Sequence, residues 1–277
     1  MRRFISRRLA IAVLAACLAP CITPPAHAAG ALQTVRPGQL TIAYRTDDKP
    51  ASFINNGQPD GFIVDFENAI GKELGLKIVF IGTDFPSMVP GVNNGRYDSA
   101  AFEVIETPQR QSVVNFTSPI TFDQARLVSR QDAPIADVDG ASGKTVAITT
   151  GSALIPILKQ MAPGVSVREF PNIAASLNAL KARQVDGLFT GLAAANHLIT
   201  ANQGLTESQI VTTGVAAFPV SKSNPGLLAA YNQAIHKLML NGTYTSLFQK
   251  WYQSKVLIPT QLYDAYPGMP RLPASAN

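Results

Sequence analysis

The chain has 277 residues, of which 46% are hydrophobic and 15% are charged, and its formal net charge is +5. This length allows one large domain or two ordinary ones, and the composition is that of a globular protein, not of a long disordered chain. Residues 1–28 hold four arginines and no acidic residue, so the remaining chain carries 19 basic and 18 acidic residues. A nearly neutral chain gives no reason to expect nucleic-acid binding.

The first 28 residues have the layout of a secretory signal peptide. Four arginines precede an apolar run from Leu9 to about Ala19, and Ala26-His27-Ala28 is a small-x-small cleavage site. The apolar run is shorter than the roughly 20 residues that a transmembrane helix needs. The sequence therefore predicts a protein that is exported to the periplasm or the extracellular space.

Both cysteines, Cys17 and Cys21, lie within this leader. Cleavage after Ala28 leaves a mature chain without cysteine, which excludes disulfides and thiolate metal sites. Leu14-Ala15-Ala16-Cys17 also resembles a bacterial lipobox, so a lipid anchor at Cys17 is the alternative to a soluble product.

The first part of the mature chain alternates strand and helix patterns. Apolar residues recur at helical spacing before Gly75, which stands where a C-terminal cap belongs. Such β-α alternation indicates a mostly parallel sheet covered by helices. In chain order the elements are a strand at Leu40–Tyr44, a helix ending at Gly75, a strand at Lys77–Ile81, a short helix near Ser87–Val92 and a strand at Tyr97–Val104.

The same pattern starts again near Lys144 and ends in helices. Ser152, Asn172 and Asn224-Pro225 are placed to begin helices. Two extended segments, 125–130 and 215–222, are interpreted as crossings between two α/β units, and the proline-rich segment 258–277 is interpreted as a C-terminal tail. The remaining elements are strands at 145–149, 165–170, 186–190 and 209–212, an alanine-rich helix after 190, and a helix containing Tyr244 and Trp251.

No catalytic or metal motif is present in the sequence. GxSxG, HExxH and CxxC are absent, and Gly143-Lys144-Thr145 lacks the earlier glycine of a P-loop because Val138 stands there. His197 and His236 are far apart, and the acidic residues lack the spacing of a calcium loop. We expect no metal, no cofactor and no catalytic residue.

An ordered series of short motifs is the most informative feature. The series resembles the family 3 solute-binding proteins of polar amino acid ABC transporters, and the resemblance runs from about residue 38 to 254. Its motifs are Asp60-Gly61-Phe62-Ile63-Val64-Asp65-Phe66, Asn94-Gly95-Arg96-Tyr97-Asp98, Glu106-Thr107-Pro108-Gln109-Arg110, Val114-Asn115-Phe116-Thr117-Ser118-Pro119, Gly143-Lys144-Thr145-Val146-Ala147, Thr150-Gly151-Ser152, Ala182-Arg183-Gln184-Val185-Asp186, Asn241-Gly242-Thr243-Tyr244 and Lys250-Trp251-Tyr252.

This resemblance implies an α/β, type II periplasmic-binding-protein fold. Its two lobes each have a central, mostly parallel sheet and are joined by two hinge crossings. Lobe 1 is expected to use residues 38–126 and 218–257, and lobe 2 residues 127–217. The lobes would close on a small polar amino-acid-like or carboxylate solute, which an ABC permease in the membrane would receive; nothing indicates an oligomer, so a monomer is expected.

The resemblance also implies the ligand-binding residues. Arg110 falls on the arginine that grips the ligand carboxylate, because a guanidinium forks onto a carboxylate through two hydrogen bonds. Gly151 and Ser152, after Thr150, fall on a pair at a helix start, where free N–H groups favour an anion. Phe85 and Phe53 would wall the pocket. The alternatives are a surface role for Arg110, an N-cap role for Ser152 and plain core packing for Phe85.

Two departures from the family pattern put ordinary α-amino acids in doubt. Gly191 stands where the family has the aspartate that binds the ligand ammonium, and a buried ammonium without a partner costs several kcal/mol. Asp48 and Ala51 occupy a loop that usually has an aromatic residue. Glu103 stands where the family has a small residue, so it either replaces the lost aspartate or pairs with Arg110.

Two other functions remain open at this point. An enzyme resembling cyclohexadienyl dehydratases would need a carboxyl group as general acid or base, and Glu103 is placed to supply it. A sensor or scaffold subunit that uses the same fold without transport is the other alternative, since fold alone does not determine function.

Overall fold

The structure is a computed structural model that describes residues 32–252 and 256–272. The predicted signal peptide, its cleavage site and the alternative lipid anchor at Cys17 lie outside the described residues. Within the described ranges, no helix combines the length and apolar character needed to cross a membrane.

The first sheet is parallel, with its strands in the order β5-β1-β6. Leu40, Ile42 and Ala43 of the central strand are fully buried, as expected for a parallel strand covered by helices on its faces. The strands are β1 Gln39–Tyr44, β5 Lys77–Gly82 and β6 Ser99–Ala101.

Two helices of this first lobe begin or end at the predicted signals. Gly75 ends α1 in the left-handed conformation, with φ of 66°, and its N–H donates to the Lys72 carbonyl. The Asn224 side chain accepts the N–H of Leu227 and begins α7. The helices are α1 Phe62–Leu74, α2 Phe85–Asn93, α3 Pro108–Gln111, α7 Pro225–Leu240 and α8 Thr243–Tyr252.

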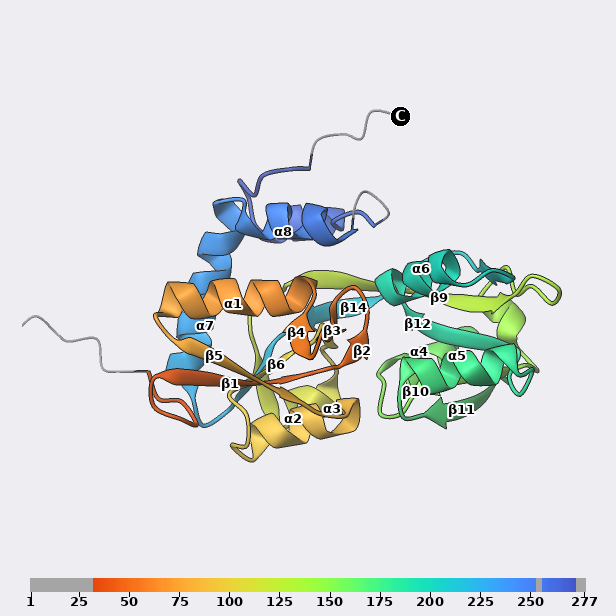
Figure 1. Cartoon of the computed structure of the whole chain (residues 1–277), viewed down its shortest axis with the longest axis horizontal. Coiled ribbons are helices and arrows are strands. Elements are labelled where there is room, and N and C mark those ends of the chain that lie inside the picture. The colour runs from red at the N-terminus through yellow and green to blue at the C-terminus, as the bar shows by residue number, and fades with distance from the viewer. Residues whose placement is uncertain (1–31, 253–255, 273–277) are drawn as a thin grey trace, which may run out of the picture. The chain divides into compact units, whose positions relative to one another are not determined.

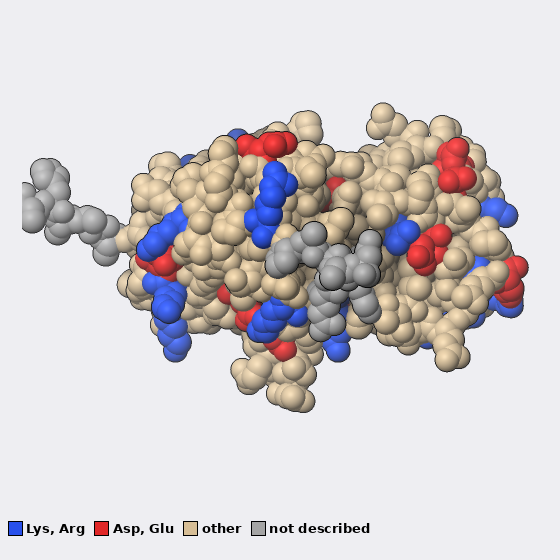
Figure 2. Space-filling view, turned by 90° about the horizontal axis from the view of Figure 1, so that it is seen from above, with Lys and Arg blue, Asp and Glu red and all other residues tan. Residues whose placement is uncertain are grey.

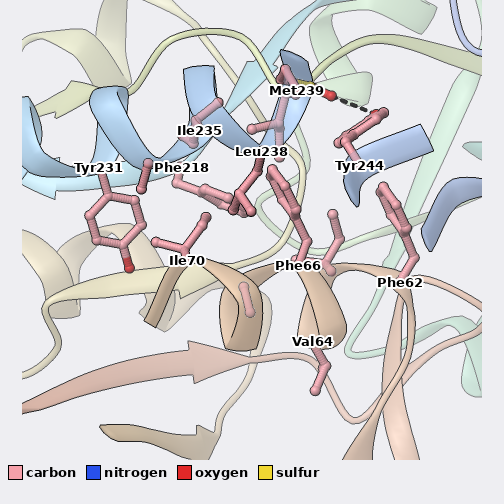
Figure 3. Close-up of a cluster of buried hydrophobic side chains, with 14 of the residues drawn as sticks. Phe62, Val64, Phe66, Ile70, Phe218, Tyr231, Ile235, Leu238, Met239 and Tyr244 are labelled. Atoms are coloured by element: carbon pink, nitrogen blue, oxygen red, sulfur yellow. Dashed lines mark hydrogen bonds between the residues drawn. The ribbon is translucent and has the colours of Figure 1, made fainter. Parts of the chain in front are cut away.

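An aromatic core joins α1, α7 and α8 (Figure 3). Phe66 and Tyr244 meet edge to face with ring centroids 5.2 Å apart, and Phe62 stands at the same separation from Tyr244. The Tyr244 hydroxyl donates to the Ile120 carbonyl at 2.7 Å, which satisfies its only buried polar atom. Chain segments from both ends of the sequence therefore share the core of this lobe.

The second sheet has the strand order β11-β10-β12-β9-β14-β7, with β13 also paired to β9. Strands β10, β11 and β12 are parallel, whereas β9 and β14 are antiparallel to their neighbours. Figure 1 shows α4, α5 and α6 grouped with β9–β12. The elements are β7 Val104–Ile105, β9 Thr121–Arg130, β10 Thr145–Thr149, β11 Ser166–Phe170, β12 Gly187–Gly191, β13 Leu205–Glu207, β14 Val211–Ala217, α4 Leu154–Met161, α5 Ile173–Lys181 and α6 Leu192–Ala201.

The two crossings between the lobes are β9 and β14, which pair directly with each other. Their antiparallel ladder runs from Thr121↔Ala216 to Ala125↔Val211 and contains a bulge between Thr212 and Gly214. Both strands begin before the segments 125–130 and 215–222 expected from the sequence, and β14 ends earlier, at Ala217. The sheet is therefore continuous across the place where the sequence put the boundary between lobes.

The segment expected to be a C-terminal tail packs onto the first lobe instead. It contains helix α9 Thr260–Ala265, whose Leu262 is fully buried in the aromatic core. The Tyr266 hydroxyl donates to the Pro119 carbonyl at 2.7 Å. Two of the proline residues, Pro259 and Pro270, flank this packed segment and do not prevent it from folding back.

Figure 2 shows one face of the molecule, on which basic and acidic side chains lie in small, separate groups among uncharged residues.

The remaining elements are short. The short strands and the 3-10 helix are β2 Asp47–Asp48, β3 Ser52–Asn55, β4 Gln58–Asp60, β8 Val114–Phe116, β15 Pro219–Ser221 and η1 Asp139–Ala141.

Candidate ligand-binding site

One cavity is lined by residues of both lobes. The first lobe supplies residues of the loops after β1 and β6, of α2, of α3 and of the start of β9. The second lobe supplies the carboxyl ends of β10 and β12 and the first turns of α4 and α6, which is where ligands bind in parallel α/β sheets. Of the residues predicted from the sequence, the cavity is lined by Arg110, Glu103, Ser152 and Phe85.

Arg110 is held in the cavity by its own helix. The Thr107 side chain accepts the Arg110 N–H at 3.2 Å and caps α3. The guanidinium donates to the Ile105 carbonyl at 2.8 Å and to the Gly151 carbonyl of the other lobe at 3.3 Å. Its burial lowers the pKa of Arg110 to about 10. Among the described residues, no carboxylate forms an ion pair with it.

Phe85 provides an aromatic platform beneath two guanidinium groups. Arg110 and Arg45 lie 5.4 and 5.9 Å from its ring centroid, within the range of cation–π attraction. Phe102 meets the Phe85 ring edge to face at 4.9 Å. Phe85 is thus both packed, with 8% of its surface exposed, and part of the cavity wall.

The turn Thr150–Ser152 is already hydrogen-bonded in this structure. The Gly151 N–H donates to Glu169 Oε2 at 3.3 Å, and the Ser152 N–H donates to the Thr149 carbonyl. Helix α4 begins two residues after Ser152, whose hydroxyl accepts the Leu154 N–H at 3.2 Å. The N-cap position of α4 is Ala153, without a side-chain cap, so Ser152 is not the N-cap considered for it. Thr150 and Gly151 lie outside the lining of the cavity.

Phe53 also lies outside the cavity lining, because its ring packs edge to face on Trp251 at 5.9 Å. Gly191 does line the cavity, at the end of β12. A β-carbon at Gly191 would have the Gln124 carbonyl oxygen as its nearest neighbour, at 4.0 Å. The position where the family has an aspartate therefore offers room for a side chain.

Glu103 lies between β6 and β7 and lines the cavity without a hydrogen bond or ion pair to any described residue. No Glu103–Arg110 ion pair is present among them, so the second of the two roles considered for Glu103 is not seen. Burial, followed by the nearby carboxyl groups of Asp123 and Asp48, raises the pKa of Glu103 well above its ordinary value.

The sequence did not identify Asp123 or a role for Asp48, yet both line the cavity. Burial raises the pKa of Asp48 to about 6 and that of Asp123 to about 7. Asp123 accepts a hydrogen bond from the Thr213 hydroxyl at 3.2 Å. An acidic residue near the start of the strand that begins at Thr121 could have drawn attention, but the local sequence does not show that Asp123 lies near Glu103.

The segment after α8 was also missed as part of the site. Val256, Leu257 and Pro259 line the cavity together with Phe248 and Tyr252 of α8. Among residues 32–252 and 256–272, no group of three His, Cys, Asp or Glu side chains is placed to hold a metal ion.

A cavity enclosed by two α/β lobes that two paired strands connect defines a two-lobed small-molecule-binding protein. The chain belongs to the bacterial extracellular solute-binding proteins, family 3, whose profile matches residues 40–254. Its fold is that of the type II periplasmic amino-acid-binding proteins, as expected from the sequence motifs.

Three similar proteins show the range of this family. The L-cystine-binding protein TcyJ of Escherichia coli (strain K12) is 26% identical over 228 residues, which cover 79% of this chain and 84% of that protein. The structure of an ancestral arginine-binding protein bound to glutamine is 28% identical, with a TM-score of 0.74, and covers 78% of this chain and 99% of its own. The structure of the ancestral amino acid-binding protein AncCDT-1, a precursor of cyclohexadienyl dehydratase, is 25% identical, with a TM-score of 0.72. It covers 78% of this chain and 96% of its own.

Proposed function

We propose that the protein is the exported substrate-binding subunit of an ABC importer and captures a small amino-acid-like solute between its lobes. The observation that carries this proposal is the Arg110 guanidinium, which faces a two-lobed cavity without a carboxylate partner among the described residues. Such a group binds a ligand carboxylate best where water is excluded. Membership of the solute-binding family supports the same role.

Capture by closure of the lobes is part of this proposal. Two contacts join the lobes beside the cavity: Arg110 to the Gly151 carbonyl, and the Ile173 N–H to Asp47 Oδ2 at 3.0 Å. Both contacts involve a charged side chain of lobe 1 and backbone of lobe 2. Ligand binding and these contacts would then stabilise the same closed arrangement.

A thermal-shift screen of the mature chain, starting at Ala29, tests the binding role. The set contains amino acids, amines, opines and small carboxylates, and a ligand that binds only the folded state raises the melting temperature by mass action. At a concentration of 100 times Kd, the stabilisation is about 2.7 kcal/mol. A positive shift that Arg110→Gln abolishes supports the proposal, whereas the absence of any shift across the set contradicts it.

An enzyme on the same scaffold is the second candidate, and one feature favours it. Glu103 is a carboxyl group in a cavity with a raised pKa, as a general acid requires, and a solved relative is a precursor of cyclohexadienyl dehydratase. Glu103 would protonate the departing hydroxyl of a cyclic dienyl carboxylic acid, which leaves as water while the ring carboxylate leaves as carbon dioxide. Incubation with prephenate or arogenate tests this, and an absence of aromatic product rules it out.

A further inference from the structure

Three carboxyl groups face the cavity without a cationic partner among the described residues. Asp48 is only 7% exposed, lines the cavity and forms no hydrogen bond or ion pair there. Glu103 likewise has neither contact, and Asp123 has a hydroxyl donor, Thr213, but no cation. Asp48 is buried, and Glu103 and Asp123 are partly buried. Because a buried carboxylate without a partner is unfavourable, protons or a cationic ligand would stabilise this arrangement.

The two described arginines of the cavity form no hydrogen bond or ion pair with these groups, although the Arg45 charge lowers the pKa of Asp48 in part. Arg45 donates to Asp47 Oδ1 at 3.2 Å through Nε and at 2.9 Å through Nη2, and forms an ion pair with that residue. Arg110 donates to two backbone carbonyls. The cavity therefore presents three carboxyl groups against one guanidinium that lacks a carboxylate partner.

We propose that Asp48, Glu103 and Asp123 form a cation-recognition cluster that selects ligands with two cationic nitrogen centres. The inference rests on the binding role proposed above and adds the chemical class of the ligand. The cluster takes over the role of the aspartate that is absent at Gly191, and it does so from lobe 1 and the start of β9. Asp48 and Asp123 are specificity-determining residues in addition to Glu103.

The apolar part of the cavity suits the chain between two such centres. Phe102 and Phe122 line the cavity together with Tyr252 and with Leu257 from the segment after α8. Methylene groups pack against apolar and aromatic side chains, while the nitrogen centres at the chain ends reach polar groups. A linear diamine and a basic amino acid share this chemistry, and only the second brings a carboxylate for Arg110.

Binding by this cluster releases protons. Burial raises the pKa of Asp48 to about 6, although the nearby Arg45 charge opposes this shift. Burial and the Asp48 carboxylate raise the pKa of Asp123 to about 7. The other titratable groups around them are Arg45 before β2, Asp47 in β2, Arg110 on α3, and Tyr244 and Tyr252 on α8. A cationic ligand favours the ionised carboxylates and lowers their pKa values in the complex. The part of the affinity that depends on Asp48 and Asp123 therefore falls as the pH decreases through 7 and 6.

Isothermal titration calorimetry of the mature chain tests the inference. The probes are 1,4-diaminobutane, lysine and ornithine, compared with alanine and glutamate at pH 8 and pH 5.5. We expect at least one dicationic probe to bind, and its affinity to be at least about tenfold weaker at pH 5.5 than at pH 8. Titrations in buffers of different ionisation enthalpy measure the protons released on binding. Loss of lysine binding with retained diamine binding in Arg110→Gln distinguishes the two ligand sources.

Matched variants identify the groups responsible. Asp123→Asn and Glu103→Gln each remove one charge at nearly constant shape, and each should weaken the binding of a dicationic probe at least about 30-fold. Glu106→Gln, a partly buried glutamate outside the cavity lining that accepts from Gln111, should leave affinity unchanged. If alanine or glutamate binds more tightly than every dicationic probe, the inference fails while the binding role stands. If none of these solutes binds and the broader thermal-shift screen is also negative, the binding role fails as well.

Discussion

The two walls of the cavity differ in charge. Among the described residues, every arginine, aspartate and glutamate that lines the cavity precedes residue 124, whereas the lining residues between 149 and 194 of the second lobe have uncharged side chains. In the proposed function, lobe 1 would select the ligand by charge, and lobe 2 would contribute shape and hydroxyl groups. A ligand can be recognised by charge on one lobe before the second lobe encloses it.

The largest expected effect is on stability, and comes from a change in the core of lobe 1 that holds the segment after α8 in place. Leu262→Ala removes a fully buried side chain from the aromatic core, on the segment that carries Leu257 and Pro259 to the cavity. We expect a loss of about 2–5 kcal/mol in the free energy of unfolding, measured by urea denaturation. Leu257→Ala is the control, because Leu257 is 73% exposed and its loss should change stability by less than about 0.5 kcal/mol.

The next variant removes the Arg110 guanidinium from the lobe 1 side of the cavity. Arg110→Gln should weaken the binding of a carboxylate-bearing ligand about 100-fold, because the ligand carboxylate would lose a desolvated bidentate partner. Calorimetry measures this effect, with Arg96→Gln as the control at a site over Tyr97 that does not line the cavity. An equal loss in both variants would contradict a direct role for Arg110.

A third variant makes the walls more alike by placing a charge on lobe 2. Gly191 has a φ of −55° and open space beyond its α-carbon, so an aspartate fits there. Gly191→Asp should tighten the binding of ordinary α-amino acids about tenfold by providing an ammonium partner. Gly226→Asp, also at an open position, is the control. Unchanged affinity in Gly191→Asp would show that the ammonium group does not reach this wall.

The smallest effect concerns the contact between the walls. Asp47 accepts the Ile173 N–H at the start of α5 with one carboxylate oxygen and binds Arg45 with the other. Asp47→Asn removes the negative charge from this helix N-terminus, which is worth about 0.3–1 kcal/mol. We expect ligand affinity to fall about threefold, and small-angle scattering of the ligand-bound protein should show a larger radius of gyration. An unchanged affinity would remove Asp47 from the closure contacts.

Local signals in the sequence predicted the elements well. The caps at Gly75, Asn172 and Asn224 were expected and are confirmed, because each depends only on neighbouring residues. The C-terminal helix α9 was not expected, since its six residues are too short for a periodic signal and Leu262 is buried by distant segments. Long-range packing, which the sequence does not display, determines its position.

Family motifs predicted only part of the cavity lining, because Arg110 and Ser152 line the cavity whereas Thr150 and Gly151 do not. Arg110, Ser152 and Phe85 were placed by family motifs, and Glu103 by its departure from one. Asp123 belongs to no motif, and its proximity to Asp48 and Glu103 follows from how β9 passes the loops of lobe 1. The combined charge of the cluster therefore appears only in the folded chain.

The pairing of β9 with β14 has a mechanical consequence. Two separate connections would allow the lobes to twist and slide independently, but a hydrogen-bonded ribbon resists shear along its strands. Opening of the cavity would therefore bend the β9–β14 ribbon perpendicular to its face instead of sliding one strand along the other. The bulge between Thr212 and Gly214, where Gly214 has a φ of 149°, interrupts the ladder and is the softest point for that bend. Stiffness at this one place would set how far the lobes swing apart.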